Sequence, residues 1–247
     1  DGQQSVISGA NAKTRRQLDF WGDERSLIKI GGASRPADTE PAHIVIENLD
    51  LQGAHIGNQF VDNKGRTHAY THHAASIYIE KGHNITLRDC TIRNSGNGLM
   101  TSHRSRNILV ERCHIHSNGN SKSIYHHNVY TESLNITFRN NRLCLLKKGA
   151  GGNNLKDRSA GLKVLENTIY GGNRQLDLVD AEDSEFLRNH EAYRLTLVEG
   201  NLLIEPAGEG NKQVVHFGGD SGKTRWYRPE LAFRNNRVIT YRKDATT

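Results

Sequence analysis

The sequence predicts an all-β protein: a parallel β-solenoid of about seven or more rungs, forming a single domain over residues 1–247. Two observations indicate this fold class. One spacing pattern of apolar residues recurs seven times between residues 43 and 240, and the segments between the copies again alternate apolar with polar residues. Internal periodicity of this kind outranks local conformational preference when a fold is predicted.

Each copy of the pattern has apolar residues (once Thr) at positions one, three and eight, and Asn, Cys or Leu at position six. The copies are Ile44-Ile46-Leu49-Leu51, Ile85-Leu87-Cys90-Ile92, Ile108-Val110-Cys113-Ile115, Ile136-Phe138-Asn141-Leu143, Leu162-Val164-Asn167-Ile169, Thr196-Val198-Asn201-Leu203 and Leu231-Phe233-Asn236-Val238. Because side chains of a strand alternate between its faces, each copy predicts two short strands with one buried face. No hairpin signal separates them, so the chain bends at position six without reversing.

The sixth position advances by 23, 28, 26, 34 and 35 residues between Cys90 and Asn236. A coil of three strands and three turns needs a little over about twenty residues, so the longer steps predict loops inserted at one turn. Asn at the bend tolerates left-handed backbone geometry, and stacked Asn amides can bond from rung to rung. A β-sandwich is the alternative, but it requires antiparallel turns at even spacing.

Other segments extend the predicted solenoid or decorate it. Strand-like pieces at 5–8 and 27–30 indicate that it begins before the first counted copy. Long insertions at 56–74 and 181–193 are expected to form walls of a cleft, since loops often border the binding face of a solenoid. Residues 205–212 are expected to form a plain exposed turn.

Composition favours an acidic polymer as partner and argues against nucleic acid and a membrane. The net charge is +6 and the pI is near 9.3, which suits an acidic polymer. Few aromatic residues lie between the dispersed Lys and Arg residues, which argues against base stacking. No apolar run approaches membrane-spanning length, and no signal peptide is visible at the start of the chain. We expect a secreted monomer, extracellular or periplasmic.

Three cysteines are too few for a disulfide framework. Cys90 and Cys113 occupy the same inward position on neighbouring rungs. We interpret them as a buried thiol stack, and a disulfide bridge between them is the alternative.

The third strand of each coil carries polar residues that folding does not require. Asn141 and Asn167 are 26 residues apart, and so are Tyr130 and Lys156, so the latter two are expected on adjacent strands about 4.8 Å apart. The residues predicted to point outward on this face are Asn128, Tyr130, Asn154, Lys156, Arg158 and Asp177, with His216 further along. A strip of this composition predicts a catalytic cleft.

Each residue of this strip also has a structural interpretation. Lys156 and Arg158 could be solvated surface charges, and Tyr130 could serve packing alone. Of the adjacent pair His126 and His127, at least one must face away from the strip, and His127 is favoured as the one near the site.

The aspartates of this region allow several interpretations. Asp157 should point inward and therefore needs a hydrogen-bonded partner, such as a turn or an arginine. Asp177, Asp180, Glu182 and Asp183 could bind Ca²⁺, or Asp177 could simply pair with a neighbouring cation. We expect no resident metal.

Three segments resemble the pectate-lyase-like superfamily of right-handed parallel β-helix proteins, in particular alginate-type polysaccharide lyases. They cover residues 127–131, 152–159 and 172–180, and the resemblance extends over roughly residues 43–240. It implies a right-handed, single-stranded β-helix. The superfamily also holds hydrolases, epimerases, esterases and non-catalytic domains, and the aspartate cluster of calcium-dependent pectate lyases has no close match here.

The resemblance implies β-elimination of a 1,4-linked uronic acid polymer, most simply alginate, without a cofactor. Arg158 would neutralise the C5 carboxylate, helped by Asn128 and Asn154. Lys156 would be the base and Tyr130 the acid, or Lys156 would lower the pKa of Tyr130 and make it the base. The other residues expected to contact or orient substrate are His127, His216 and Asp177.

Two other functions stay open on the sequence. One is a glycoside hydrolase that pairs Asp177 with Asp180 or Asp183. The other is a non-catalytic glycan-binding or structural solenoid, for which a strip of exposed aromatic residues is expected. Only Tyr78 and Tyr130 stand out as such residues.

Overall fold

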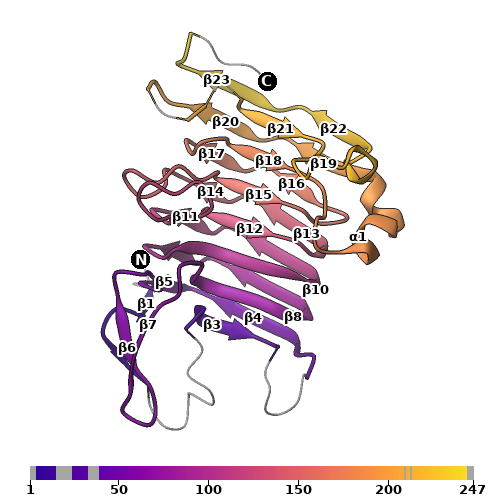
Figure 1. The fold of residues 1–247 in the computed structure, drawn as a ribbon. Helices are drawn as coiled ribbons and strands as arrows, with labels where there is room; N and C mark the ends of the chain where they lie inside the picture. The colour runs from indigo at the N-terminus through magenta and orange to yellow at the C-terminus, as the bar shows by residue number, and fades with distance from the viewer. Residues whose placement is uncertain (1–3, 15–23, 33–38, 209, 212, 244–247) are drawn as a thin grey trace.

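The computed structural model describes residues 4–14, 24–32, 39–208, 210–211 and 213–243, which form a parallel β-helix (Figure 1). Successive coils of the chain stack on one another, and their strands pair in parallel in two long sheets. The predicted all-β solenoid is therefore confirmed. Within these ranges no helix is long and apolar enough to cross a membrane.

The first long sheet contains the strand that follows the bend of each coil. In sheet order its strands are β1 (Ser5–Ser8), β5 (Leu49–Gln52), β9 (Thr91–Arg93), β11 (His114–His116), β14 (Arg142–Leu143), β17 (Thr168–Tyr170), β20 (Leu202–Glu205) and β23 (Arg237–Thr240). β1 pairs with β5 ahead of the first repeat. The coil thus begins before the first copy, as the strand-like piece at 5–8 predicts.

The second long sheet contains the other two strand positions of every coil. Its strands are β3 (Ser26–Ile30), β4 (Ala42–Glu47), β8 (Ala75–Arg88), β10 (Asn97–Glu111), β12 (Val129–Thr131), β13 (Leu134–Arg139), β15 (Leu155–Asp157), β16 (Lys163–Leu165), β18 (Leu176–Leu178), β19 (Leu195–Glu199), β21 (Val215–Phe217) and β22 (Glu230–Arg234). β8 and β10 are continuous across both positions. Later coils divide them, so that β10 pairs with both β12 and β13.

The remaining elements lie outside the two long sheets: β2 (Ala12–Lys13), β6 (Gln59–Val61), β7 (Thr67–Ala69), α1 (Glu185–Asn189), η1 (Glu191–Arg194) and η2 (Thr224–Trp226). Several of them belong to the two predicted insertions. β6 and β7 form an antiparallel hairpin inside the 56–74 insertion. The 181–193 insertion begins a short helix because the Ser184 hydroxyl accepts a hydrogen bond from the backbone N–H of Leu187 at 3.2 Å.

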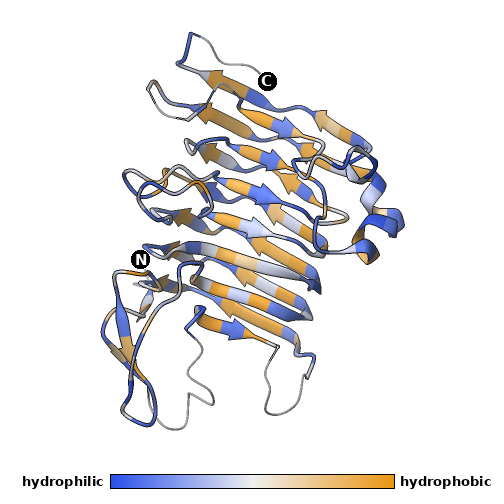
Figure 2. Cartoon of the chain, in the orientation of Figure 1, coloured by the Kyte–Doolittle hydropathy of each residue, from blue (hydrophilic) through white to orange (hydrophobic). Residues whose placement is uncertain are grey.

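Aliphatic side chains stacked from coil to coil fill the interior, and hydrophobic and hydrophilic positions alternate along the strands (Figure 2). Ile108 is the register partner of Ile85, and Val110 that of Leu87; all four are buried. Burying a side chain of this size contributes about 1.5–3 kcal/mol. The repeat therefore stabilises the coil through contacts between neighbouring rungs.

A ladder of Asn side chains runs up the bend position. The ladder consists of Asn141, Asn167, Asn201 and Asn236, and each Nδ2 donates to the Oδ1 of the next residue at 2.9, 3.0 and 2.9 Å. The predicted stacking is confirmed. The left-handed backbone at the bend belongs to the residue before each ladder residue and not to the ladder Asn: Asn140, Glu166, Gly200 and Asn235 have positive φ. That residue turns the chain, and the ladder amide can then point inward.

Cys90 and Cys113 occupy the ladder position in two earlier coils. Both are buried free thiols, so the thiol-stack interpretation holds and the bridge does not. The backbone N–H of Cys113 donates to Oδ1 of Asn141 at 2.9 Å, which joins the thiols to the Asn ladder.

Candidate functional site

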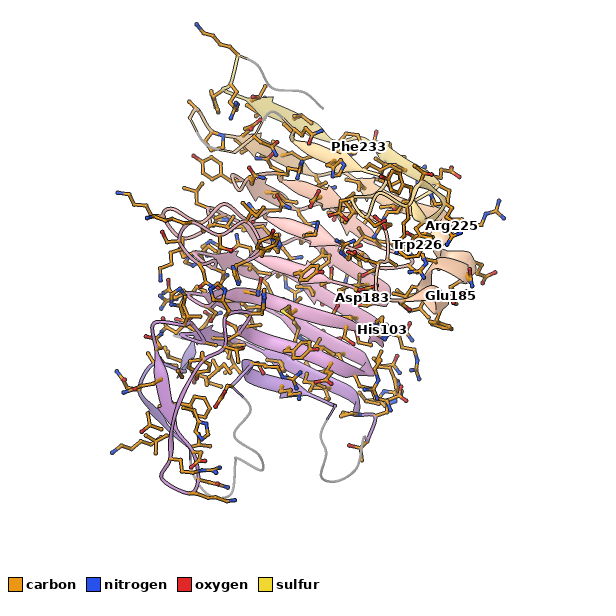
Figure 3. The ribbon with its side chains drawn as sticks, viewed as in Figure 1. His103, Asp183, Glu185, Arg225, Trp226 and Phe233 are labelled. Carbon is orange, nitrogen blue, oxygen red and sulfur yellow. The ribbon has the colours of Figure 1, made fainter. Side chains whose placement is uncertain are left out.

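A pocket of ≈ 480 Å³ lies on the outer face of the second sheet, above β12, β15, β18 and β21. It is lined by His73, Ile124, Tyr125, His127, Tyr130, Asn153, Lys156, Arg158, Asn173, Arg174, Asp177, Glu182, His216 and Asp220. The turns that lead into these strands form its first wall, and the segments 180–194 and 218–228 that follow two of them form its second wall. In Figure 3, Glu185, Arg225 and Trp226 lie together on the second wall.

Strand register aligns four outward residues over this pocket, here called the outward column. Tyr130 pairs with Lys156, Lys156 with Asp177, and Asp177 with His216. Their apolar strand neighbours lie in the core or pack against it, so alternation directs the four side chains outward. The predicted alignment of Tyr130 with Lys156, and of Asp177 beside Lys156, is confirmed.

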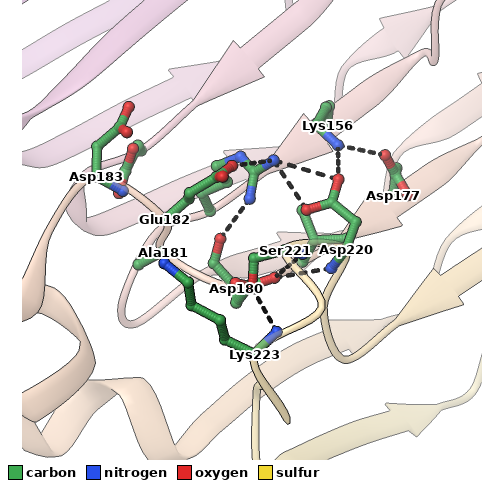
Figure 4. Close-up of polar contacts among 12 residues, drawn as sticks. Lys156, Asp177, Asp180, Ala181, Glu182, Asp183, Asp220, Ser221 and Lys223 are labelled. Carbon is green, nitrogen blue, oxygen red and sulfur yellow. Dashed lines mark hydrogen bonds and ion pairs between the residues drawn. The ribbon is translucent and has the colours of Figure 1, made fainter. Parts of the chain in front are cut away.

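Lys156 lies at the centre of a network of charges (Figure 4). Its Nζ donates to Oδ2 of Asp177 at 2.9 Å and to Oδ2 of Asp220 at 2.7 Å. A nitrogen that donates to two carboxylates is bonded as an ammonium and presents no lone pair to an incoming proton. This geometry suits a fixed positive charge better than a general base.

Asp177 orients His216. The Asp177 carboxylate is 2% exposed, and it accepts hydrogen bonds from Asn153 Nδ2 at 2.7 Å and from His216 Nδ1 at 2.7 Å. Burial alone would raise its pKa, but the bonds from His216 and Lys156 hold the pKa of Asp177 well below its usual range. An ionised Asp177 makes Nδ1 of His216 the donor, which leaves the Nε2 lone pair free to take a proton.

Arg158 lines the pocket as predicted, but it is only 5% exposed and already has partners. It donates to the backbone oxygen of Asp180 at 2.7 Å and to Oδ1 of Asp220 at 2.9 Å, and it pairs with Glu182 at 3.2 Å. The Arg158 guanidinium also acts electrostatically on the nearby phenol of Tyr130. Burial raises the pKa of Tyr130 despite the opposing charge of Arg158, so the phenol is suited to donate a proton.

The structure distinguishes between the two adjacent histidines as predicted. His127 lines the pocket, and its Nδ1 accepts the backbone N–H of Asn153 at 2.8 Å. Burial, followed by the charge of Lys156, lowers the pKa of His127 to about 3, so the ring is neutral with its proton on Nε2. His126 is buried outside the pocket lining, where it bonds His72 Nδ1 at 3.0 Å.

The prediction that Asn128 and Asn154 point outward is wrong. Both side chains are fully buried, and Asn128 Nδ2 donates to Asn154 Oδ1 at 2.7 Å. Asn118 donates to Asn128 at 3.0 Å from the preceding turn. Strand alternation does not extend to these positions because β12 and β15 begin one residue later. They form a second, structural amide ladder and are unavailable to a ligand.

Asp157 points inward, as predicted. Its carboxylate accepts hydrogen bonds from Thr131 Oγ1 at 2.6 Å, from the backbone N–H of Ser159 at 2.9 Å and from Arg228 Nη2 at 2.5 Å. The expected turn and the expected arginine are therefore both present, and Arg228 is itself buried.

Two charged residues of the lining, Asp220 and Arg174, are among those not predicted from the sequence. Asp220 follows β21 in a glycine-rich turn and lies 64 residues from Lys156 along the chain. Arg174 donates from Nε and Nη2 to Gln213 Oε1 at 2.9 and 2.7 Å, with Nη1 3.6 Å from Asp177. The Gly-Gly-Asp-Ser-Gly run is the signal for a tight turn that could have drawn attention to Asp220.

The remaining acidic residues do not gather at one point. Asp180 is fully buried beneath the Asp220 turn, and its Oδ1 accepts the backbone N–H of Asp220 at 2.8 Å. Asp183 is exposed on the second wall and outside the pocket lining. Among the described residues, no group of three or more His, Cys, Asp or Glu side chains is arranged to hold a metal ion. The acidic cluster considered for Ca²⁺ therefore does not assemble.

Comparison with known proteins identifies the fold family. The family described as "Right handed beta helix region" matches residues 31–190, more than half of the chain. Searches of curated proteins and of solved structures found no match. The coils continue beyond the matched region through β19 to β23. The chain therefore belongs to the right-handed β-helix family.

Proposed function

We propose that the protein is a polysaccharide lyase that cleaves a 1,4-linked, alginate-like uronic acid polymer by β-elimination. One observation carries the proposal: His216, oriented by a buried Asp177, shares a pocket with the protonated phenol of Tyr130 and with three cations. Base, acid and positive charge are the three requirements of β-elimination at a uronate. The right-handed β-helix family is shared by many functions, so the argument for activity rests on this pocket.

The proton-transfer roles differ from those suggested by the sequence alone. His216 takes the C5 proton on Nε2, a C4=C5 double bond forms as the C4–O4 bond breaks, and Tyr130 protonates the departing O4. Tyr130 interacts with Arg158 of the next coil, and His216 bonds Asp177 of the preceding coil. Both side chains therefore face the coils of Lys156 and Asp177, which lie between them, and a ring bound there can reach both.

The cations have separate tasks. Lys156 is a fixed charge beneath the reacting ring, where it stabilises the electron density that develops on the carboxylate as C5 loses its proton. Arg174 is half-buried, lines the pocket and has its guanidinium oriented by Gln213, so it is the cation best placed for a substrate carboxylate. Arg158 holds the Asp220 turn and acts on the reaction through Tyr130.

A hydrolase is less well supported. Asp180 is buried as a ligand of backbone N–H groups, and Asp183 lies outside the pocket lining, so neither is a partner for Asp177. Asp177 and Asp220 both face Lys156, but the lowered pKa of Asp177 leaves it without the proton that a general acid donates. We further propose a secreted monomer that acts without a resident metal on an acidic polysaccharide, with neither nucleic acid nor a membrane as partner.

The test is an assay of unsaturated products by near-ultraviolet absorbance on alginate, polymannuronate, polyguluronate, glucuronan, pectate and glycosaminoglycans, with and without chelator. We expect a rise on one polymer that the chelator does not abolish. Tyr130→Phe should lose about 10²–10⁴-fold in turnover. Tyr241→Phe is the matched control, because Tyr241 is exposed and lies outside the pocket lining.

No absorbance on any polymer, together with release of reducing ends, would replace the lyase by a hydrolase. If neither unsaturated products nor reducing ends form, the protein is a non-catalytic binding solenoid. A rate that falls with chelator and returns with Ca²⁺ would overturn the metal-free mechanism.

A further inference from the structure

An exposed aromatic residue on the first wall has no part in the proposed chemistry. Tyr125 is 68% exposed and the adjacent Ile124 is 61% exposed, and both line the pocket. The rest of the lining is mostly charged or hydrogen-bonding. Two neighbouring apolar side chains exposed at the mouth of a polar pocket form a surface that a ligand can cover.

The turn that carries Tyr125 is held firmly against the next turn. The backbone N–H of Gly151 donates to the Ser123 oxygen at 2.9 Å, and that of Lys122 donates to the Gly149 oxygen at 2.7 Å. The Ser123 hydroxyl also bonds Nδ1 of His126 at 2.7 Å. Because this backbone is already ordered, binding of a ligand to the Tyr125 ring costs little further conformational entropy.

The turn is held from a second side by a group of histidines. His126 bonds His72 at 3.0 Å, and its ring stacks on His73 with ring centroids 4.9 Å apart. His73 also lines the pocket, next to the Tyr125 turn. The first wall is thus tied to the hairpin insertion that precedes β8.

The Tyr125 turn leads into β12, which carries the proposed acid Tyr130, whereas Lys156, Asp177 and His216 lie on the three following strands of the same sheet. Tyr125 therefore lies beside the Tyr130 end of the pocket, where the neighbour of a ring placed over Lys156 can reach it. Sugar rings have an apolar C–H face that packs on an aromatic ring, while their hydroxyls stay in water.

We infer that Tyr125, with Ile124 beside it, is a sugar-stacking subsite that binds the ring adjacent to the cleaved linkage of an acidic polysaccharide. This inference rests on the proposed function and adds the subsite that gives preference for longer chains. The subsite contributes to binding and not to proton transfer.

The test measures binding in the absence of turnover. Calorimetry with di- to hexasaccharides of alginate, pectate and glucuronan is performed on His216→Ala protein, alone and combined with Tyr125→Ala, Tyr125→Trp or Tyr241→Ala. We expect Tyr125→Ala to weaken binding of the longer oligosaccharides about tenfold and to leave the disaccharide nearly unaffected. Tyr125→Trp should retain the affinity, and Tyr241→Ala, which removes an equally exposed tyrosine, should change nothing.

The outcomes separate the subsite from the lyase. Equal affinity of Tyr125→Ala and the parent at every length would overturn the subsite, even if the wild type cleaves a polymer. If oligosaccharide binding depends on Tyr125 but the wild type yields no unsaturated product, the subsite is supported and the lyase activity is excluded. Failure of the parent to bind any of these oligosaccharides would overturn the subsite directly.

Discussion

Two columns of polar side chains climb the same coils, and they differ in what they repeat. The Asn ladder from Asn141 to Asn236 uses one residue type, and each amide bonds the next. The outward column uses a different residue on every strand, from Tyr130 to His216. The ladder satisfies its own hydrogen bonds from within the repeat, whereas the outward column takes partners from turns outside it, such as Asp220.

This difference separates stability from chemistry within one repeat. A residue that recurs at each rung contributes through its neighbours above and below, so its loss is felt as stability. At a position that departs from the repeat, an aliphatic residue would stack on its neighbours equally well, so the residue present there is not required for stacking. Substitutions in the outward column should therefore change activity more than stability, and substitutions in the ladder should do the reverse.

The largest expected effect is on turnover. His216→Ala removes the proposed base and should lower kcat by about 10²–10⁴-fold, whereas the free energy of unfolding should fall by only about 1 kcal/mol, because the buried Asp177 keeps its bonds to Asn153 and Lys156. Initial rates and urea denaturation measure the two quantities. Partial rescue by added imidazole would identify proton transfer as the lost function, and a rate near that of the wild type would remove His216 from the mechanism.

The next effect contrasts two buried carboxylates on the outer face. Burial, followed by the charge of Asp183, raises the pKa of Glu132 to about 7, whereas its cationic partners lower that of Asp177. Folded Glu132 therefore keeps a proton that the unfolded chain releases above about pH 4.3. Its contribution to stability is complete below that pH and is lost as the pH rises through about 7.

Between about pH 4 and pH 8, the raised pKa of Glu132 should cost the wild type up to about 3 kcal/mol of unfolding free energy. Glu132→Gln cannot ionise, so the variant should not show this loss. Urea denaturation at several pH values tests this, with Glu182→Gln as the control because Glu182 is half exposed. Parallel pH profiles for wild type and Glu132→Gln would contradict the raised pKa.

A smaller effect tests the ladder itself. Asn167→Ala leaves the buried backbone N–H of Asn141 without its acceptor and removes one of the two hydrogen bonds that Asn201 Oδ1 accepts from residue 167, which should cost about 1–3 kcal/mol of unfolding free energy. Turnover per folded molecule should stay within about twofold of the wild type. A large loss of activity at full stability would mean that the two columns are coupled.

The smallest effect comes from an Asn ladder on the surface. Asn107 donates to Asn84 at 3.2 Å and accepts from Asn135 at 3.4 Å, and all three are exposed with positive φ. Asn107→Gly keeps the left-handed backbone and removes only these solvated bonds, so the change should stay within about 0.5 kcal/mol. A loss as large as that of Asn167→Ala would show that stacking alone, rather than burial, stabilises the ladders.

Much of the fold could be predicted because its information is local. The spacing of Ile85, Leu87 and Ile92 defines two strands and an inward face, and the next copy repeats it. The alignment of Tyr130 with Lys156 follows from the equal spacing of the ladder residues. Alternation failed at Asn128 and Asn154 because these residues belong to turns, where side-chain direction is not set by the pleat.

The sequence by itself determined the coil, its register and the composition of the outward column, since each depends on contacts between equivalent positions of adjacent rungs. Only the tertiary structure decided what those residues do. Lys156 became a bonded ammonium because the turn after β21 brings Asp220 to it across 64 residues of chain. His216 became the candidate base because Asp177 is ionised and faces its Nδ1. Turn conformation sets both contacts, and no periodicity encodes it.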